Sequence, residues 1–165
     1  MAQLQEKFGA LVTMSSTSCN MLTAGSAIGW ESSAIDNTNI SGGLYLDALV
    51  QLTIPFGASA PAGDKAIYIY SYGALSGSYP NPITGSQGLV TAGNAVTGVN
   101  LRSLYTITVG TSSQLLTTPP LSVALSFGGV LPPKWGLVVL NDAGGVFMTG
   151  TSVAIKWKGC YVQSV

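Results

Sequence analysis

Side chains able to do acid–base chemistry are few in this chain. It contains no histidine, so the commonest general base is absent and ordinary serine or cysteine triads are excluded. The carboxyl groups are those of Glu6, Glu31, Asp36, Asp47, Asp64 and Asp142. Two carboxylates across a cleft could hydrolyse a glycosidic bond, and Asp36 and Asp47 are candidates only because nothing better is available. Asp36, Asp64 and Asp142 are more typical of turns, where aspartate caps the backbone. We therefore predict no catalytic residues and no enzymatic activity.

Metal and cofactor sites are not indicated either. The segment Asp36–Ser41 (DNTNIS) is similar to the start of a calcium loop, but the glycine and glutamate that such a loop needs are missing. Cys19 and Cys160, with no histidine to join them, cannot form an ordinary zinc site. We expect both to be small buried thiols of a reducing compartment, with a disulfide between them as the alternative.

Aromatic residues suggest one possible binding face. In Lys65–Gly73 (KAIYIYSYG), the period of two places Tyr68, Tyr70 and Tyr72 on the same side of a strand. Together with a nearby tryptophan they could stack against a sugar, although such rows more often form core or subunit interface. The candidate stacking or interface face consists of Tyr68, Tyr70, Tyr72, Trp30 and Trp135.

Charge is sparse over the whole chain, which has 165 residues, 47% of them hydrophobic, with six basic and six acidic side chains and a net charge of zero. A folded monomer of this size exposes about 7,600 Å², or about one charge per 600 Å². Freely soluble domains usually carry far more charge and avoid a net charge of zero. We therefore expect a protein that works packed against neighbours. The only basic pair, Lys156 and Lys158, is too little for a nucleic-acid site.

No segment is typical of a membrane span or a secretory signal. The most apolar stretch, Leu121–Leu140, is interrupted by two glycines and two prolines and carries Lys134. The first residues include Glu6 beside Lys7 and only a short apolar patch. We therefore expect no membrane partner and synthesis in a cytoplasm.

The strongest β signal is the alternation of Leu44–Ile54, which predicts a strand with one buried face, ended by Pro55. The face that we expect to be buried carries Leu44, Leu46, Ala48, Val50, Leu52 and Ile54. Lys65–Gly73 is bulky on both faces, so we predict a central strand whose tyrosine side is covered by protein or ligand. In the last apolar run, we expect Lys156 and Lys158 to face outward.

Other apolar runs complete an all-β pattern. They predict strands at 101–109, 121–127, 135–141 and 151–163, with softer signals at 8–14, 27–35 and 89–91. A tight turn at Ala143–Gly145 predicts a hairpin onto Val146–Gly150. About eight strands at this spacing favour a single-domain β-sandwich of the jelly-roll type, with an immunoglobulin-like sandwich as the alternative. Residues 27–165 would form the sandwich, and residues 1–26 an N-terminal arm or first strand that contacts another subunit.

Three segments also carry a resemblance to a known family. Ala34–Pro55, Asp64–Gly73 and above all Phe127–Asp142 (FGGVLPPKWGLVVLND) resemble small proteins encoded in the structural gene clusters of tailed bacteriophages. The resemblance covers the chain from about Trp30 onward, and its motifs are structural, so no functional residues carry over.

The resemblance implies a virion component made in the cytoplasm of a bacterial host. The resemblance first implies a head decoration, or cement, protein with a sandwich fold. Such a protein would form a homotrimer on the capsid surface and contact the major capsid protein. A phage tail component is the alternative within this class. A carbohydrate-binding or adhesin module of jelly-roll type, built on the tyrosine face, is the alternative outside it.

Overall fold

The structure is a computed structural model that describes residues 3–20, 22–24, 28–38, 44–62, 65–91, 101–147 and 152–164. Asp64, one of the aspartates expected in a turn, lies outside these residues, as do residues 39–41 of the DNTNIS segment and residues 148–150 of the expected hairpin.

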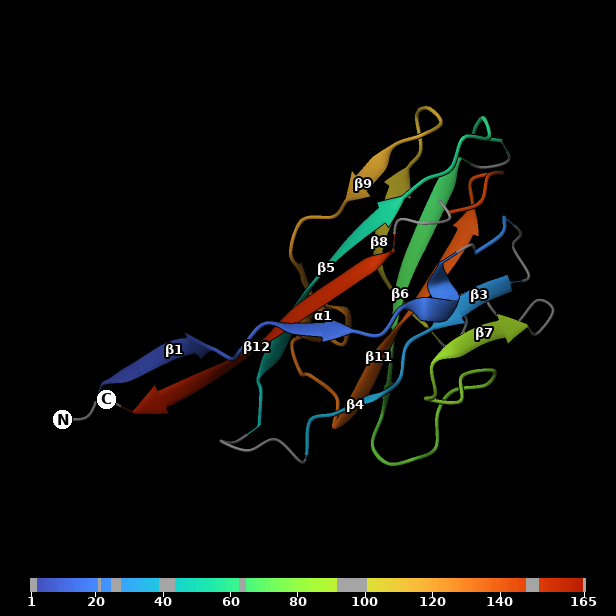
Figure 1. The fold of residues 1–165 in the computed structure, drawn as a ribbon. Coiled ribbons are helices and arrows are strands. Elements are labelled where there is room, and N and C mark those ends of the chain that lie inside the picture. Colours follow the sequence, from blue (N-terminus) through green and yellow to red (C-terminus); the bar gives the residue numbers. More distant parts are fainter. Residues whose placement is uncertain are drawn as a thin grey trace.

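The described strands form two antiparallel six-stranded sheets that face each other (Figure 1). Sheet A contains β1 (Leu4–Phe8), β2 (Val12–Met14), β5 (Asp47–Pro55), β9 (Leu115–Thr117), β10 (Leu121–Ser122) and β12 (Ala154–Ser164). Sheet B contains β3 (Ile28–Glu31), β4 (Ile35–Asp36), β6 (Ala66–Ala74), β7 (Gly88–Thr91), β8 (Arg102–Thr108) and β11 (Lys134–Asp142). The described helices are the short η1 (Thr17–Cys19) and α1 (Val123–Ser126).

The strand order is that of a jelly roll. Sheet A has the order β1-β12-β5-β10, and sheet B has β3-β11-β6-β8 with β7 added beside β3. β1 and β2 both pair with β12, and β9 and β10 both pair with β5, although β9 and all of β1 except Phe8 lie outside the expected strands. The predicted all-β sandwich is confirmed, with more and shorter strands than the eight expected.

The N-terminal segment belongs partly to the sandwich and partly to a projection. Met14, Cys19 and Leu22 lie in the core between the sheets, so the expected division between residues 26 and 27 does not separate two structural units. β1, in contrast, pairs among the described strands with the end of β12 alone, from Phe8 opposite Cys160 to Leu4 opposite Ser164. We call β1 and residues 161–164 of β12 the arm.

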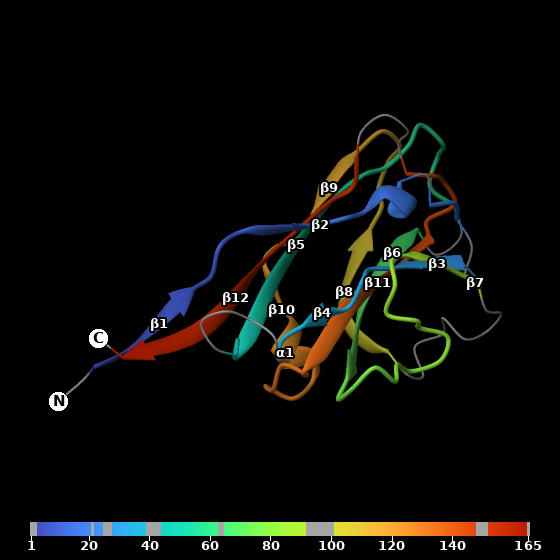
Figure 2. The ribbon, with the colours of Figure 1, turned by 60° about the horizontal axis from the view of Figure 1, so that its bottom comes forward.

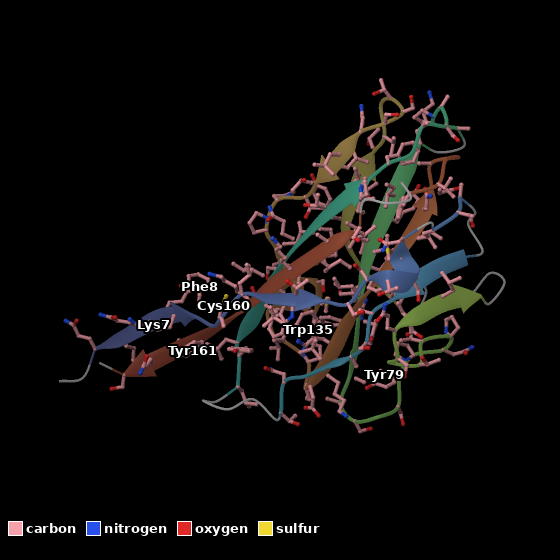
Figure 3. All side chains as sticks on the ribbon, viewed as in Figure 1. Lys7, Phe8, Tyr79, Trp135, Cys160 and Tyr161 are labelled. Carbon is pink, nitrogen blue, oxygen red and sulfur yellow. The ribbon has the colours of Figure 1, made fainter. Side chains whose placement is uncertain are left out.

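The arm extends away from the sandwich as a two-stranded ribbon, with both chain termini at its tip (Figures 1 and 2). Pairing between β5 and β12 ends at Asp47 and Cys160, and beyond this point the described strand pairing of the arm is that between β1 and β12. Figure 3 shows Lys7 and Phe8 on β1, with Tyr161 of the arm and Cys160 at its base opposite them on β12.

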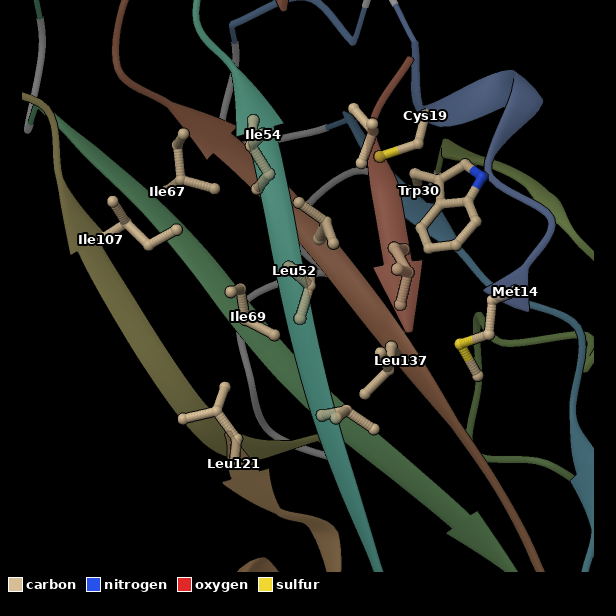
Figure 4. Close-up of a cluster of buried hydrophobic side chains, with 14 of the residues drawn as sticks. Met14, Cys19, Trp30, Leu52, Ile54, Ile67, Ile69, Ile107, Leu121 and Leu137 are labelled. Carbon is tan, nitrogen blue, oxygen red and sulfur yellow. The ribbon is translucent and has the colours of Figure 1, made fainter. Parts of the chain in front are cut away.

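The main core lies between the two sheets (Figure 4). The inward face of β5 carries Ala48, Val50, Leu52 and Ile54, all fully buried as predicted. Leu44 and Leu46 were expected on the same face but are exposed, because β5 begins only at Asp47. The side-chain amide of Asn37 pairs with the backbone of Tyr45 at 3.0 and 3.1 Å, in place of a neighbouring strand.

The predicted strand at 121–127 is wrong, because after two β residues the chain turns into α1. Ser122 Oγ accepts from the amide of Leu125 at 3.1 Å, and a carboxylate oxygen of Asp47 accepts from that of Ala124 at 2.8 Å. Gly129, at a φ of 95°, closes the helix by donating to the carbonyl of Ala124 at 2.8 Å. These local bonds satisfy the helix ends and override the β pattern.

Of the predicted hairpin at Ala143–Gly145, the turn is confirmed, and the chain after it is described only as far as Phe147. Phe147 bridges to Phe56, which follows β5. The amide of Asn141 donates to the carbonyls of Gly145 at 2.6 Å and Leu22 at 2.9 Å. This buried amide holds the turn and directs the following chain toward the other sheet.

Candidate functional site

The tyrosine face exists, and the protein's own chain covers much of it. Tyr68, Tyr70 and Tyr72 lie on the outer face of β6, which is central between β11 and β8. The segment 75–91 crosses over this face. The ring of Tyr79, which belongs to this segment, packs edge-on against the ring of Tyr72 with a centroid distance of 5.8 Å. The prediction of a central strand with a covered aromatic side is therefore confirmed, and the cover is protein.

Tyr72 is the most enclosed of the three tyrosines. It is fully buried, and its hydroxyl donates to the carbonyl of Ser32 at 2.7 Å. Burial raises the pKa of Tyr72 well above its ordinary value. Ile83, Val90, Leu101, Val138 and Leu140 pack around it as a second core. Tyr72 is thus a structural residue and not an open binding group.

Trp30 and Trp135 do not join the tyrosines, so this part of the predicted face is wrong. Both are fully buried in the main core, on the opposite side of sheet B. The reason is the alternation of β11, where Trp135 points between the sheets while Val138 points toward the tyrosines. The sequence reveals each strand's two faces but not which faces of different strands coincide.

Two rings of the predicted platform remain partly accessible. Tyr68 and Tyr70 are half-buried, and their centroids are 6.3 Å apart with planes inclined by 27°. Burial raises the pKa of Tyr70. These two rings are all that the outer face of β6 leaves for stacking against a ligand.

Glu31 is a buried carboxylate that sequence analysis did not single out. It is only 3% exposed and accepts hydrogen bonds from Thr84 Oγ1 at 2.6 Å, from the Thr84 amide at 3.0 Å and from the Gly85 amide at 3.3 Å. These bonds tie the covering segment to β3, across more than fifty residues of sequence. The signal available beforehand was a lone acid inside an apolar strand, which does not reveal its partner.

The carboxylates suggested as a catalytic pair have local structural roles. A carboxylate oxygen of Asp36 accepts from the amide of Thr38 at 2.9 Å and from its hydroxyl at 2.5 Å, which lowers the pKa of Asp36. A carboxylate oxygen of Asp47 accepts from the amides of Ala48 at 2.7 Å and Ala124 at 2.8 Å. Asp36 therefore caps a turn, as expected.

The structure also shows where Asp142 and the two cysteines lie. Asp142 ends strand β11 instead of capping a turn. Cys19 and Cys160 are both buried free thiols, as predicted. The residues that the structure describes contain no group of three or more side chains suited to hold a metal ion.

The arm presents one apolar and one polar face. Opposed residues of antiparallel strands share a face, so Leu4, Glu6 and Phe8 lie on the same side as Val162. Leu4 is 76% exposed, Phe8 52% and Val162 46%. The opposite side carries Gln5, Lys7, Tyr161 and Gln163. Three exposed apolar side chains therefore cluster on one face of the arm.

The base of the arm is firmly joined to the sandwich. The ring of Tyr45 lies against Gly159, where an added Cβ would come within 2.3 Å of it, and its hydroxyl lies against Gly9. Tyr45 contacts Tyr161 at a centroid distance of 6.1 Å and Trp157 at 5.9 Å. This aromatic packing fixes the direction in which the arm leaves the body.

A groove lies on the outer face of sheet A beside the base of the arm. It has a volume of about 460 Å³ and is lined by Phe8, Leu11, Leu49, Pro120, Lys156 and Lys158, among others. Lys156 and Lys158 are exposed, as predicted. Every second residue of β12 points to the same side, so Lys156, Lys158 and Cys160 share one side of the strand. Because Cys160 lies opposite Phe8, this is also the side of the arm's apolar face. The groove and the apolar face of the arm thus form one continuous surface.

Comparison with known proteins assigns no family. In the part of the chain that the structure describes, no helix is both long and apolar enough to cross a membrane. No family model, no curated protein and no solved structure matches this chain.

Proposed function

We propose that this chain is a non-enzymatic structural protein of a phage virion, which decorates and stabilises the capsid by oligomerising on its surface. The structural role is supported by one observation above all: a rigidly based arm whose apolar face is open and continuous with an apolar groove. The virion context is supported by the sequence resemblance. The localisation on a capsid and the contact with a major capsid protein belong to this proposal.

The energetics of the arm favour a role in assembly. An isolated two-stranded ribbon is marginally stable in water, and its outer edges present unpaired backbone groups. Burial of apolar surface contributes roughly 2.5 kcal/mol for each 100 Å². Contact with another subunit would therefore cover Leu4, Phe8 and Val162 and order the ribbon at the same time.

The carbohydrate-binding alternative has weaker support. A stacking platform needs open aromatic rings with polar side chains beside them, and only Tyr68 and Tyr70 keep partial access. Tyr79 covers Tyr72, and Trp30 and Trp135 face the core. Less than half of the predicted platform is therefore available to a sugar. We therefore favour assembly over sugar binding.

The role of the arm is tested by measuring the oligomeric state of the protein in solution. We expect the purified protein to form an oligomer, a trimer by the resemblance, and the variant Phe8→Asp to dissociate at least tenfold more readily. Leu75→Asp is the matched control, since Leu75 is 87% exposed but lies away from the arm. Light scattering after size-exclusion chromatography measures the mass. A monodisperse wild-type monomer at high micromolar concentration would contradict assembly by self-association.

The virion role is tested by labelled-antibody electron microscopy of purified particles. Label over the head supports decoration, and label over the tail supports the tail alternative. Particles that carry the gene's product in neither place would exclude a virion role.

A further inference from the structure

We propose that the arm of one copy docks into the groove of a second copy, with Glu6 placed beside Lys156 and Lys158 of its neighbour. This inference rests on the proposed function, and it names the chain itself as the partner at that surface.

The chemistry of the two surfaces is complementary. The groove combines apolar side chains with Lys156 and Lys158, and none of the described residues that line it carries a carboxylate. Among the described residues, the one salt bridge joins Lys134 to Asp36 at 3.5 Å, so neither groove lysine is neutralised there. A fitting occupant would therefore carry apolar side chains around a carboxylate.

The arm has this composition on its open face. Glu6 lies between Leu4 and Phe8 along β1, with Val162 opposite it on β12. No salt bridge within the described residues uses the carboxylate of Glu6. An apolar ribbon with one central negative charge therefore matches an apolar groove with two positive charges.

The two surfaces cannot satisfy each other within one copy. The arm's apolar face and the groove both face outward from sheet A, side by side along β12, and Tyr45 fixes the base of the arm. Two side-by-side patches of one sheet face point in the same direction and cannot be brought into contact without breaking the arm base. A second copy, turned to face the first, can place its arm over the groove.

Other classes of partner fit less well. Two lysines neutralise too few phosphates for nucleic acid and are fewer than the basic cluster that an anionic membrane requires. An acidic and apolar segment of an unrelated protein has the same chemistry as the arm, so the experiment must distinguish it from a second copy.

The test is a charge exchange read by sedimentation equilibrium of the full chain at low salt. We expect Glu6→Lys, and separately Lys156→Glu with Lys158→Glu, each to weaken self-association at least tenfold, because each places like charges together. The triple variant that combines all three changes should recover to within about threefold of the wild type. Lys65→Glu with Arg102→Glu is the control, since it makes the same change in net charge on exposed residues outside the groove. Urea unfolding of each variant verifies that the fold is kept.

The outcomes separate this inference from the proposed function. Recovery in the triple variant, with the control unaffected, supports arm-in-groove docking. If the charge-exchange variants associate as strongly as the wild type, or if the triple variant does not recover, arm-in-groove docking is overturned. Assembly through another surface then remains possible under the proposed function. A monomeric wild type whose binding to capsids is lost with Lys156→Glu and Lys158→Glu assigns the groove to another protein and also overturns arm-in-groove docking. A monomer that is absent from virions removes both proposals.

Discussion

The outer faces of the two sheets differ in how they are covered. On sheet B, the segment 75–91 crosses the strands and closes a second core around Tyr72. On sheet A, the corresponding face carries an open groove, two exposed lysines and the apolar side of the arm. The comparison shows that a sandwich can cover one face with its own chain and leave the other for a neighbour. We infer that the uncovered face is the working surface.

The segment that covers sheet B is held by a polar anchor as well as by apolar packing. Glu31 supplies it, because its carboxylate satisfies backbone and hydroxyl donors of the segment at Thr84 and Gly85. A buried carboxylate is costly unless it is hydrogen-bonded, and these donors offset that cost. On sheet A, the carboxylate of Asp47 instead binds the amides of Ala48 and Ala124 and so holds α1 at the edge of the sheet. Lys156 and Lys158, on the outer face, are exposed.

The largest expected effect is a difference in stability between side-chain truncations on the outer faces of the two sheets. Tyr72→Ala should lower the free energy of unfolding by about 3 to 5 kcal/mol, because it leaves a cavity in the second core. Leu49→Ala, on the half-buried floor of the groove, should cost less than about 1 kcal/mol. Urea unfolding of the monomeric state measures both. Equal losses at the two positions would show that the outer face of sheet A is also a packed core.

An intermediate effect is expected from the polar anchor. Glu31→Gln should lower the free energy of unfolding by about 1.5 to 3 kcal/mol, since a charged acceptor is replaced by a neutral amide among backbone donors. Glu6→Gln, on the exposed arm, is the matched control and should leave a monomer's stability within about 0.5 kcal/mol of wild type. Limited proteolysis should cut the 75–91 segment faster in Glu31→Gln alone. An unchanged cutting pattern would mean that the segment is held by its apolar contacts only.

The smallest effect on stability concerns Cys160, at the junction of the arm and sheet A. Cys160→Ala should lower the free energy of unfolding by about 1 kcal/mol, because it removes a single buried sulfur atom and adds no polar group. Burial raises the pKa of Cys160, and the carboxylates of Asp47 and Glu6 raise it further, so little thiolate exists at neutral pH. Alkylation should therefore be slow in the folded protein, and should accelerate with rising pH and on unfolding. Labelling of Cys160 at the rate of a free thiol at pH 7 would show that the arm base opens readily.

Patterns local in sequence predicted the main elements well. The alternation of β5 identified its buried face, and that of β6 identified both the tyrosine row and the central position of the strand. The same reasoning failed at α1, because the Ser122 and Asp47 caps that favour the helix are not visible in hydrophobic alternation. It also placed Trp30 and Trp135 beside the tyrosines, although they face the opposite side.

The candidate site was predicted only in outline. Residues 1–26 were expected to contact another subunit, and β1 does project as part of the arm, but Met14, Cys19 and Leu22 complete the core of the same chain. The groove combines residues from the arm base, β5, β12 and the segment before β10. Residues so distant in sequence carry no mutual signal, so the groove could not be foreseen.

The sequence alone determined that this protein is a sparsely charged all-β domain without histidine chemistry, because composition and alternation of period two are local properties. Only the tertiary structure decided which sheet face is covered, where Glu31 finds its donors and how the arm leaves the body. Those features depend on contacts between segments far apart in the chain, and such contacts exist only once both sheets have formed.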